Sequence, residues 1–361
     1  MWSATEVFSA PAGRENDPNW DNYFASITLD SKGLPHIPHY ANLFLVYLYQ
    51  TDSGIWETRG SGYWTPSDYW NVSPIIDSAL DSNDNPYFVY PWYSDFPANR
   101  IKLSYRNAAG GWSHVPGIST VRGVLPSIKL DSNDKFHISY NNWGSPWALN
   151  YVYGTPEGFI REAVDSSGQE SSVVVDYANK PHISYWYDTT KKLKYAYKTA
   201  ETWVKEVVDP LVNVGRYTSM AVDAGGRPHF SYYDITNNTL KYAYKKPDGT
   251  WVTVTVDSGN VGKWTSIALD SNGKPHITYF DALSNTSLRY ARYLGSEGSW
   301  ANGIGGIKDV DPGAAKAWWF ITTVASGAGG PNAIALDAAN RPHISYVDTT
   351  LSKRRYATLT R

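Results

Sequence analysis

Short segments of alternating apolar and polar residues recur along the chain. Residues 26–30 read Ser-Ile-Thr-Leu-Asp, and similar segments return at 127–131, 172–176, 219–223 and 266–270. An alternation with a period of two residues places the apolar side chains on one face of a β-strand. Each segment is followed, after a short break, by a run related to Pro-His-Ile-Ser-Tyr. The pattern therefore predicts two strands joined by a hairpin.

The residues between the two strands predict a tight turn. Counted from the Asp that closes the first strand, the third residue is always Gly, Asn or Asp: Gly33, Asp84, Asp134, Asn179, Gly226, Gly273 and Asn340. These residue types tolerate a positive φ better than any others. We therefore expect a hairpin loop that ends in a left-handed residue.

Seven copies of this hairpin motif span the chain. Their aspartates, which lie 51, 50, 45, 47, 47 and 67 residues apart, are Asp30, Asp81, Asp131, Asp176, Asp223, Asp270 and Asp337. In six copies a third strand with Leu-x-Tyr follows, whereas the seventh has Arg354 and Tyr356 at these positions. A fourth strand opens with Trp or Phe. Repeat units therefore begin near residues 26, 77, 127, 172, 219, 266 and 333.

The N-terminal segment matches the fourth strand that the seventh copy lacks. The seventh copy stops at Arg361 before any fourth strand, while the chain begins with "WSATEVFSA", which matches "WVKEVVDP" at 203–210. An N-terminal strand that completes the last blade would close a ring. The sequence predicts an all-β, single-domain seven-bladed β-propeller over residues 1–361, with four-stranded blades, a design that hides most sheet edges.

In these repeats the chain resembles the seven-bladed propellers with BNR-type, sialidase-like repeats. It is also similar to the propeller polysaccharide lyases, whose repeats read Asp-x-x-Gly-x-x-His, as in "DSNGKPHI" at 270–277. The resemblance implies an extracellular protein that binds or cleaves glycans. The full sialidase box, Ser-x-Asp-x-Gly-x-x-Trp, is absent from the sequence, so no catalytic motif carries over.

The repeated histidine is predicted to be part of the scaffold. It occupies one position in six copies, with Tyr87 in the second: His36, His137, His182, His229, His276 and His343. A catalytic group is needed once rather than six times. We expect interior imidazoles that are bonded to a neighbouring backbone group, and we look for function where the repeat is broken.

Departures from the repeat cluster in the first three blades. Long or aromatic-rich loops lie at 14–23, 62–70, 90–100 and 140–147. In a propeller these loops share one face, so they predict an asymmetric cleft that binds an oligo- or polysaccharide by aromatic stacking and polar contacts. The candidate ligand-binding residues are Trp20, Tyr23, Tyr63, Trp64, Tyr69, Trp70, Trp92, Tyr93, Asp95, Arg122, Asn141, Trp143 and Trp147. Two alternatives are that these aromatic side chains pack against one another, or that they form a protein-interaction platform.

One departure bears on catalysis. His39 stands where the other six copies have Tyr, beside Tyr40. The resemblance to propeller lyases suggests a β-elimination in which Arg14 neutralises a uronic acid, His39 removes a proton and Tyr40 protonates the leaving oxygen. A glycoside hydrolase would instead use a pair of carboxylates such as Glu15 and Asp17. His39 could also replace Tyr purely in packing, and since nothing else marks a reactive group, we favour binding without catalysis over either enzyme.

The amino-acid composition narrows the classes of cofactor and partner. The chain has no cysteine, which excludes disulfides and Cys-ligated metals. Its net charge of −2, without a basic run, argues against nucleic acid or an anionic membrane surface as partner. No apolar run is long enough to span a bilayer. The Asp-x-Asn-x-Asn stretch at 81–85 lacks the later Gly and Glu of a calcium loop, so we expect neither metal nor cofactor.

Two further expectations concern the cellular location of the protein and an insertion in blade 6. The N-terminus lacks a signal peptide, so an extracellular location rests on the resemblance, and a cytoplasmic one is not excluded. Blade 6 carries an insertion at 296–318 between its third and fourth strands, on the face opposite the aromatic loops. A lid, an oligomer contact and a simple decoration are all compatible with this Gly- and Ala-rich segment.

Overall fold

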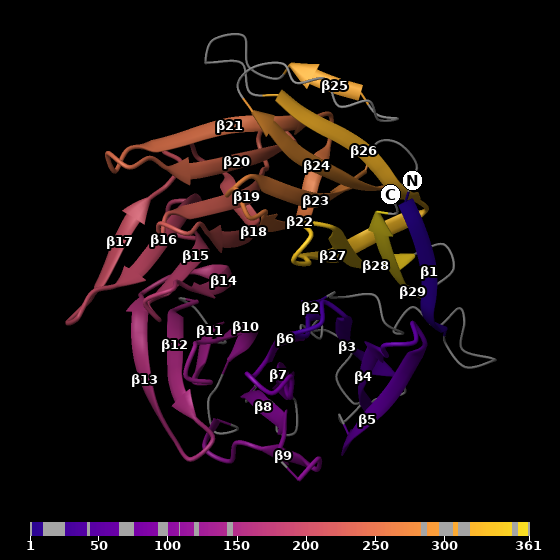
Figure 1. Ribbon diagram of the computed structural model, residues 1–361. Helices are drawn as coiled ribbons and strands as arrows, with labels where there is room; N and C mark the ends of the chain where they lie inside the picture. Colours follow the sequence, from indigo (N-terminus) through magenta and orange to yellow (C-terminus); the bar gives the residue numbers. More distant parts are fainter. Residues whose placement is uncertain are drawn as a thin grey trace.

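Seven antiparallel sheets surround a central axis in the computed structural model (Figure 1). The structure describes residues 2–9, 26–41, 44–64, 76–92, 100–107, 109–118, 123–142, 147–282, 287–295, 306–309, 318–348 and 353–359. Each sheet is one blade, and its strands follow one another from the axis outward. The predicted seven-bladed β-propeller is confirmed.

The strands occupy the positions that the repeat predicts. Blades 1 and 2 contain β2 (Thr28–Leu29), β3 (Pro35–Ala41), β4 (Phe44–Gln50), β5 (Trp56–Trp64), β6 (Asp77–Leu80), β7 (Pro86–Trp92), β8 (Arg100–Arg106) and β9 (Trp112–His114). Blades 3 and 4 contain β10 (Val124–Leu130), β11 (Phe136–Asn141), β12 (Leu149–Thr155), β13 (Gly158–Asp165), β14 (Gln169–Val175), β15 (Pro181–Tyr187), β16 (Lys192–Lys198) and β17 (Trp203–Val207).

The later blades follow the same order until the ring closes. Blades 5 and 6 contain β18 (Val214–Val222), β19 (Pro228–Asp234), β20 (Thr239–Lys245), β21 (Trp251–Ser258), β22 (Val261–Leu269), β23 (Pro275–Asp281), β24 (Ser287–Gly295), β25 (Gly306–Asp309) and β26 (Trp318–Ser326). Blade 7 contains β27 (Ala328–Leu336), β28 (Pro342–Asp348), β29 (Lys353–Leu359) and β1 (Trp2–Ser9).

The N-terminal strand closes the ring. β1 pairs antiparallel with β29, from Trp2 opposite Leu359 to Ser9 opposite Lys353, and the two ends of the chain lie side by side in Figure 1. The Trp2 ring meets the Tyr290 ring of blade 6 edge-on, with centroids 5.2 Å apart. Trp203 meets Tyr151 of the preceding blade in the same way at 5.0 Å. Trp2 therefore fills the fourth-strand position of the last blade.

Blade 6 departs from the predicted four strands. β25, from within the 296–318 insertion, pairs with β26 on the outer side of the sheet and makes the blade five-stranded (Figure 1). Part of the insertion thus extends the sheet edge, an outcome that its Gly-rich sequence did not predict.

The predicted turns have the expected backbone. All seven turn residues have positive φ, for example 58° at Asp134 and 73° at Gly273. Within the turn, Oδ1 of Asp131 accepts hydrogen bonds from the backbone N–H groups of Asn133 (2.8 Å) and Lys135 (3.0 Å). The motif aspartate is therefore a turn cap.

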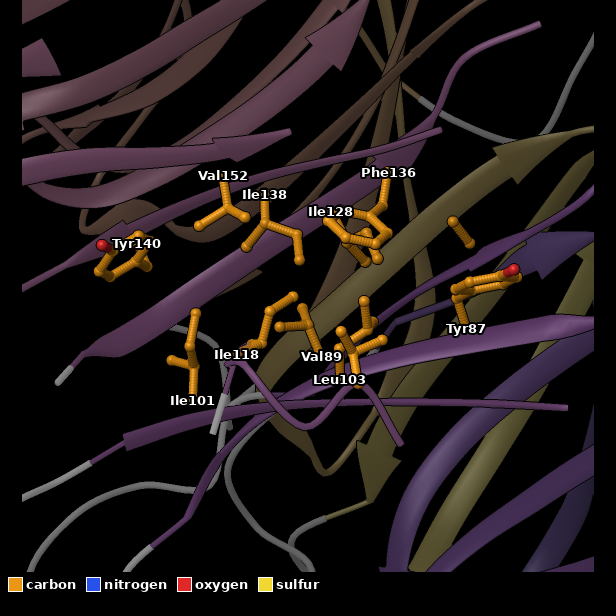
Figure 2. Packing of buried hydrophobic residues seen from close by; sticks show 12 residues of the cluster. Tyr87, Val89, Ile101, Leu103, Ile118, Ile128, Phe136, Ile138, Tyr140 and Val152 are labelled. Carbon is orange, nitrogen blue, oxygen red and sulfur yellow. The ribbon is translucent and has the colours of Figure 1, made fainter. Parts of the chain in front are cut away.

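The hydrophobic core lies between neighbouring blades. Every residue of β11, β19, β23 and β28 is buried, because each second strand is covered on both faces by adjacent blades. Between blades 2 and 3, Val89 and Leu103 belong to the same cluster as Ile128 and Ile138 (Figure 2). Removal of these side chains from water holds adjacent blades together.

Candidate functional site

The repeated histidines are confirmed as scaffold, but their partners are side chains rather than backbone. Nδ1 of His182 lies 2.6 Å from the hydroxyl of Tyr195 on the third strand, and the same pair recurs at His137 with Tyr151 and at His343 with Tyr356. Nε2 of the histidines lies 3.3 to 3.9 Å from the motif aspartate. Burial lowers the pKa of His182, which keeps the ring neutral.

The face on which function was predicted is defined by strand direction. We call the upper face the end of the ring at which second and fourth strands finish. His39 and Tyr40 lie near the upper end of β3, where they pair with Val46 and Leu45. Trp92 ends β7 and Trp64 ends β5, close to Tyr63. The backbones of these five candidates therefore reach the upper face.

Most of the predicted cleft lies outside the described residues. This group comprises Arg14, Trp20, Tyr23, Tyr69, Trp70, Tyr93, Asp95, Arg122 and Trp143. Two predicted residues are described with their surroundings, Asn141 and Trp147. The Asn141 amide donates to the carbonyl of Gly168, whose N–H donates to the carbonyl of Trp147 over 2.7 Å. Asn141 is fully buried, so it positions the loop instead of facing a ligand.

A row of unusual backbone conformations continues from this point around the axis. Leu125, Glu170, Tyr217 and Trp264, which we call the upper-rim residues, have φ values of 53°, 52°, 54° and 47°. Each lies two residues before the serine that opens the hairpin motif of its blade. The strand register shifts between the residue before each upper-rim residue and that serine, as at Lys263/Ser266 around Trp264. Each upper-rim residue therefore sits in a β-bulge on an innermost strand.

Blades 5 and 6 build this bulge from one short motif. The sequence reads Val-Gly-Arg-Tyr-Thr-Ser at 214–219 and Val-Gly-Lys-Trp-Thr-Ser at 261–266. A Cβ on Gly215 would lie 2.7 Å from the Cα of Leu193, and one on Gly262 would lie 2.7 Å from the Cα of Leu240. Glycine is thus required for the close approach to the preceding blade.

Half-buried aromatic and charged side chains meet at these two bulges. The rings of Tyr217 and Trp264 have centroids 5.3 Å apart at an interplanar angle of 47°. The Arg216 guanidinium lies 4.7 Å from the centroid of Trp186, and Lys263 Nζ lies 5.8 Å from that of Tyr233. Each cation therefore lies over an aromatic ring of the preceding blade.

Glu170 ties the first of these bulges to blade 4. One of its carboxylate oxygens lies 2.5 Å from Arg216 Nη2, and the other accepts a hydrogen bond from the backbone N–H of Tyr217 at 2.6 Å. Burial and the Glu170 charge raise the pKa of the Tyr217 hydroxyl, so this group is a neutral donor at physiological pH. Arg216 and Tyr217 are consequently held in place before any ligand arrives.

Sequence reasoning missed this cluster. The Val-Gly-[Arg/Lys]-[Tyr/Trp]-Thr-Ser match between 214–219 and 261–266 was a visible signal. The loops that carry it have ordinary lengths, so they do not stand out as departures from the repeat. Trp147 connects the aromatic loop at 140–147 with this cluster, because its hydrogen-bond partner Gly168 lies two residues before Glu170.

A second set of buried charges acts between blades. Asp209 at the end of blade 4 accepts a hydrogen bond from Tyr232 of blade 5 over 2.7 Å and forms an ion pair with Lys241. Equivalent groups are Asp165 with Tyr185 and Lys194, and Asp257 with Tyr279 and Arg289. Asp209 is 1% exposed. The three aspartates are buried, and each group joins two neighbouring blades.

The described part of the chain contains no group of three or more His, Cys, Asp or Glu side chains that could hold a metal ion. The same residues include no helix long and apolar enough to cross a membrane.

Comparison with known proteins supports the fold. No family profile and no curated protein sequence matches the chain. Similar solved structures include polysaccharide lyase Uly1 (10% identity, 97% of this chain and 91% of that chain, TM-score 0.59). An ulvan lyase bound to -[GlcA(1-4)Rha3S]- has 10% identity, with 98% and 94% covered and a TM-score of 0.60. The intramolecular trans-sialidase from Ruminococcus gnavus has 10% identity, with 99% and 97% covered and a TM-score of 0.51.

The expected resemblance to propeller lyases and sialidases is therefore confirmed at the level of fold. Identities near 10% carry no residue roles to this chain.

Proposed function

We propose that this protein binds an oligo- or polysaccharide on its upper face, with Tyr217 and Trp264 as stacking platforms. The observation that carries the proposal is the left-handed backbone of four upper-rim residues whose side chains all differ. A non-glycine residue costs about 1–2 kcal/mol in this conformation. Glycine would form the same bulge without that cost. Tyr and Trp therefore occupy these positions because of what their side chains do.

The chemistry of the cluster suits sugars. Pyranose rings have apolar C–H faces, which stack on aromatic rings, and hydroxyl groups, which hydrogen-bond to charged and polar side chains at the ring edge. Tyr217 and Trp264 supply two half-buried aromatic rings. Arg216, Glu170 and the Tyr217 hydroxyl supply donors and an acceptor beside them. The similarity in fold to lyases and sialidases agrees with this ligand class.

We extend the site from blade 3 into the cleft proposed for blades 1–3. Trp147 adjoins Gly168 and so connects the upper rim to the aromatic loop at 140–147. We propose that the predicted residues Trp92 and Trp143 contact a longer chain. We further propose an extracellular location for the protein, because the ligand class is a polysaccharide.

A glycan array, followed by titration calorimetry on the hits, tests the proposal. Trp264→Ala and Tyr217→Ala should each weaken binding about 5- to 30-fold, since a buried stacking contact contributes roughly 1–2 kcal/mol. Tyr177→Ala is the matched control, because Tyr177 is 83% exposed in a lower-face turn of blade 4. Absence of glycan binding by the unaltered protein would overturn the proposal. Loss of affinity in Trp143→Ala as well would support the longer cleft.

An enzyme that uses the same face is the alternative for this ligand class. His39, Tyr40 and Arg14 are the candidate group for β-elimination, and the backbones of His39 and Tyr40 reach the upper face on β3. Incubation of each glycan hit separates the cases. An ultraviolet band of an unsaturated uronate that His39→Ala abolishes indicates a lyase, whereas new reducing ends without that band indicate a hydrolase.

A protein-interaction platform is favoured by one separate observation. Leu211, Val212 and Ile235 are 50%, 55% and 38% exposed on two upper-face loops. The loops are joined by a 2.9 Å hydrogen bond from the N–H of Ile235 to the carbonyl of Asn213. A Leu211→Ser, Val212→Ser variant that retains glycan binding but loses a protein partner would support this second function.

A further inference from the structure

The bulges of blades 5 and 6 are two copies of one binding element, placed side by side. β18 and β22 are neighbouring innermost strands (Figure 1). Arg216 pairs with Tyr233 and Lys263 pairs with Phe280 at the same register of their sheets. Each copy offers an aromatic upper-rim residue, a cation one residue earlier and an aromatic ring below that cation. Two equivalent elements suit two successive units of one repeating polymer.

The two copies differ in charge balance. Arg216 is neutralised by Glu170, the upper-rim residue of the preceding blade. The residue that corresponds to Glu170 for Lys263 is Tyr217, which stays uncharged because burial and Glu170 raise its hydroxyl pKa. Among the described residues, no carboxylate lies within 4 Å of Lys263 Nζ. One copy is therefore electrically balanced, while the other has a net positive charge.

Building on the proposed function, we infer that the upper rim binds two successive units of an anionic glycan. The unit over Trp264 carries a carboxylate or sulfate that pairs with Lys263, and the unit over Tyr217 lies beside the balanced Arg216–Glu170 pair. A half-buried ammonium pairs with an anion more strongly than an exposed one, since less water screens it. The ligand class is an acidic oligosaccharide of at least two residues.

The test compares acidic oligosaccharides with the same chains after their charge has been removed. The probes are uronate oligosaccharides, their methyl esters, sulfated oligosaccharides and the desulfated chains. The unaltered protein should bind one charged class at least about 10-fold more tightly than its neutral form, a difference of about 1.4 kcal/mol. Preference for uronates or for sulfated chains identifies which group Lys263 meets.

Two charge variants give opposite expectations. Lys263→Met keeps an apolar stem and should reduce affinity for the charged probes about 10-fold, with little change for the neutral ones and a weaker salt dependence. Glu170→Gln can still accept the Tyr217 N–H but frees the Arg216 charge, so it should raise affinity for the charged probes several-fold. Lys246→Met, in an exposed lower-face turn, is the control.

The outcomes separate this inference from the proposed function. Equal binding of charged and neutral probes overturns the anionic class, and a charge preference that Lys263→Met does not reduce overturns the role of Lys263. Both outcomes leave carbohydrate binding intact. Equal affinity for a monosaccharide and a disaccharide overturns the paired units. Failure to bind any glycan overturns the proposed function itself.

Discussion

Ser271 and Asn340 form a two-bond lock between the hairpin turns of blades 6 and 7. The Asn340 side-chain oxygen accepts the Ser271 N–H over 2.9 Å, and its amide donates to the Ser271 hydroxyl over 2.9 Å. Ser132 with Asn179, Ser82 with Asp134 and Ser31 with Asp84 repeat the relationship. In the remaining three interfaces the turn residue is Gly, and the preceding blade has Tyr177, Ala224 or Ala338 in place of Ser. Serine and its acceptor are thus present together or absent together.

This pairing predicts that the two hydrogen bonds can be introduced at an interface that lacks them. Ala224→Ser with Gly273→Asn should add the bonds between blades 5 and 6, because φ at Gly273 is 73° and a Cβ there would meet only Asp223 Cβ, at 3.8 Å. We expect a favourable coupling energy of about 1 kcal/mol between the two substitutions in a double-mutant cycle. Urea denaturation of the wild type, both single variants and the double variant provides the measurement. Strictly additive effects would contradict the lock.

The same turns show why so much of the fold was predictable. A left-handed turn residue restricts the amino acid to Gly, Asn or Asp, so backbone geometry is visible as residue type at Gly33 or Asn179. At the upper rim the same φ is imposed by register shifts between strands, and it is occupied by Leu125 or Trp264. No single residue type marks such a bulge, and only the match between 214–219 and 261–266 signals it. Trp147 and Asn141 stand out in the sequence because their loop is rich in aromatic residues, and their contact with a ligand stays a prediction.

Buried imidazoles predict a loss of stability in mild acid. Burial lowers the pKa of His229 and of His276 to about 4, although Asp223 and Asp270 act to raise it. The unfolded value is 6.5. Between these values the unfolded chain binds protons that the folded protein does not, so stability is complete above 6.5 and falls as the pH decreases toward 4. The slope is about 1.4 kcal/mol per pH unit for each histidine.

Denaturant unfolding at about pH 7.5 and about pH 5 measures this slope, together with proton uptake. At about pH 5, His276→Asn should reduce the number of protons taken up on unfolding by about one. Equal stability at the two pH values would show that the folded histidines titrate normally.

For the ion pair between blades 4 and 5, removing one partner should lower the free energy of unfolding far more than replacing the whole group with apolar side chains. Asp209→Ala should cost about 3–5 kcal/mol, because it leaves the buried Lys241 ammonium and the Tyr232 hydroxyl without their partner. Adding Lys241→Met and Tyr232→Phe removes those uncompensated groups, and most of the loss should return. Ala325, at the corresponding position of blade 6 opposite Leu288, shows that the fold tolerates an apolar residue there. A triple variant as unstable as Asp209→Ala would rule out charge burial as the cause.

The backbone at Trp264 allows stability and binding to be separated in one residue. At an ordinary strand position Gly is less stable than Ala, by roughly 0.5–1 kcal/mol. At Trp264, with φ at 47°, the order should reverse, and Trp264→Gly should be more stable than Trp264→Ala by about 1 kcal/mol. Lys263→Gly and Lys263→Ala, one residue earlier, should show the ordinary order. Urea denaturation of the four variants decides the question.

Both Trp264 variants lack the indole ring, so both should lose glycan affinity to the same extent despite their different stabilities. Affinity that instead follows stability would mean that Trp264 supports the fold and does not contact the sugar. A reversed Gly–Ala order combined with equal loss of binding is expected only if the strained bulge exists to hold this side chain toward a ligand.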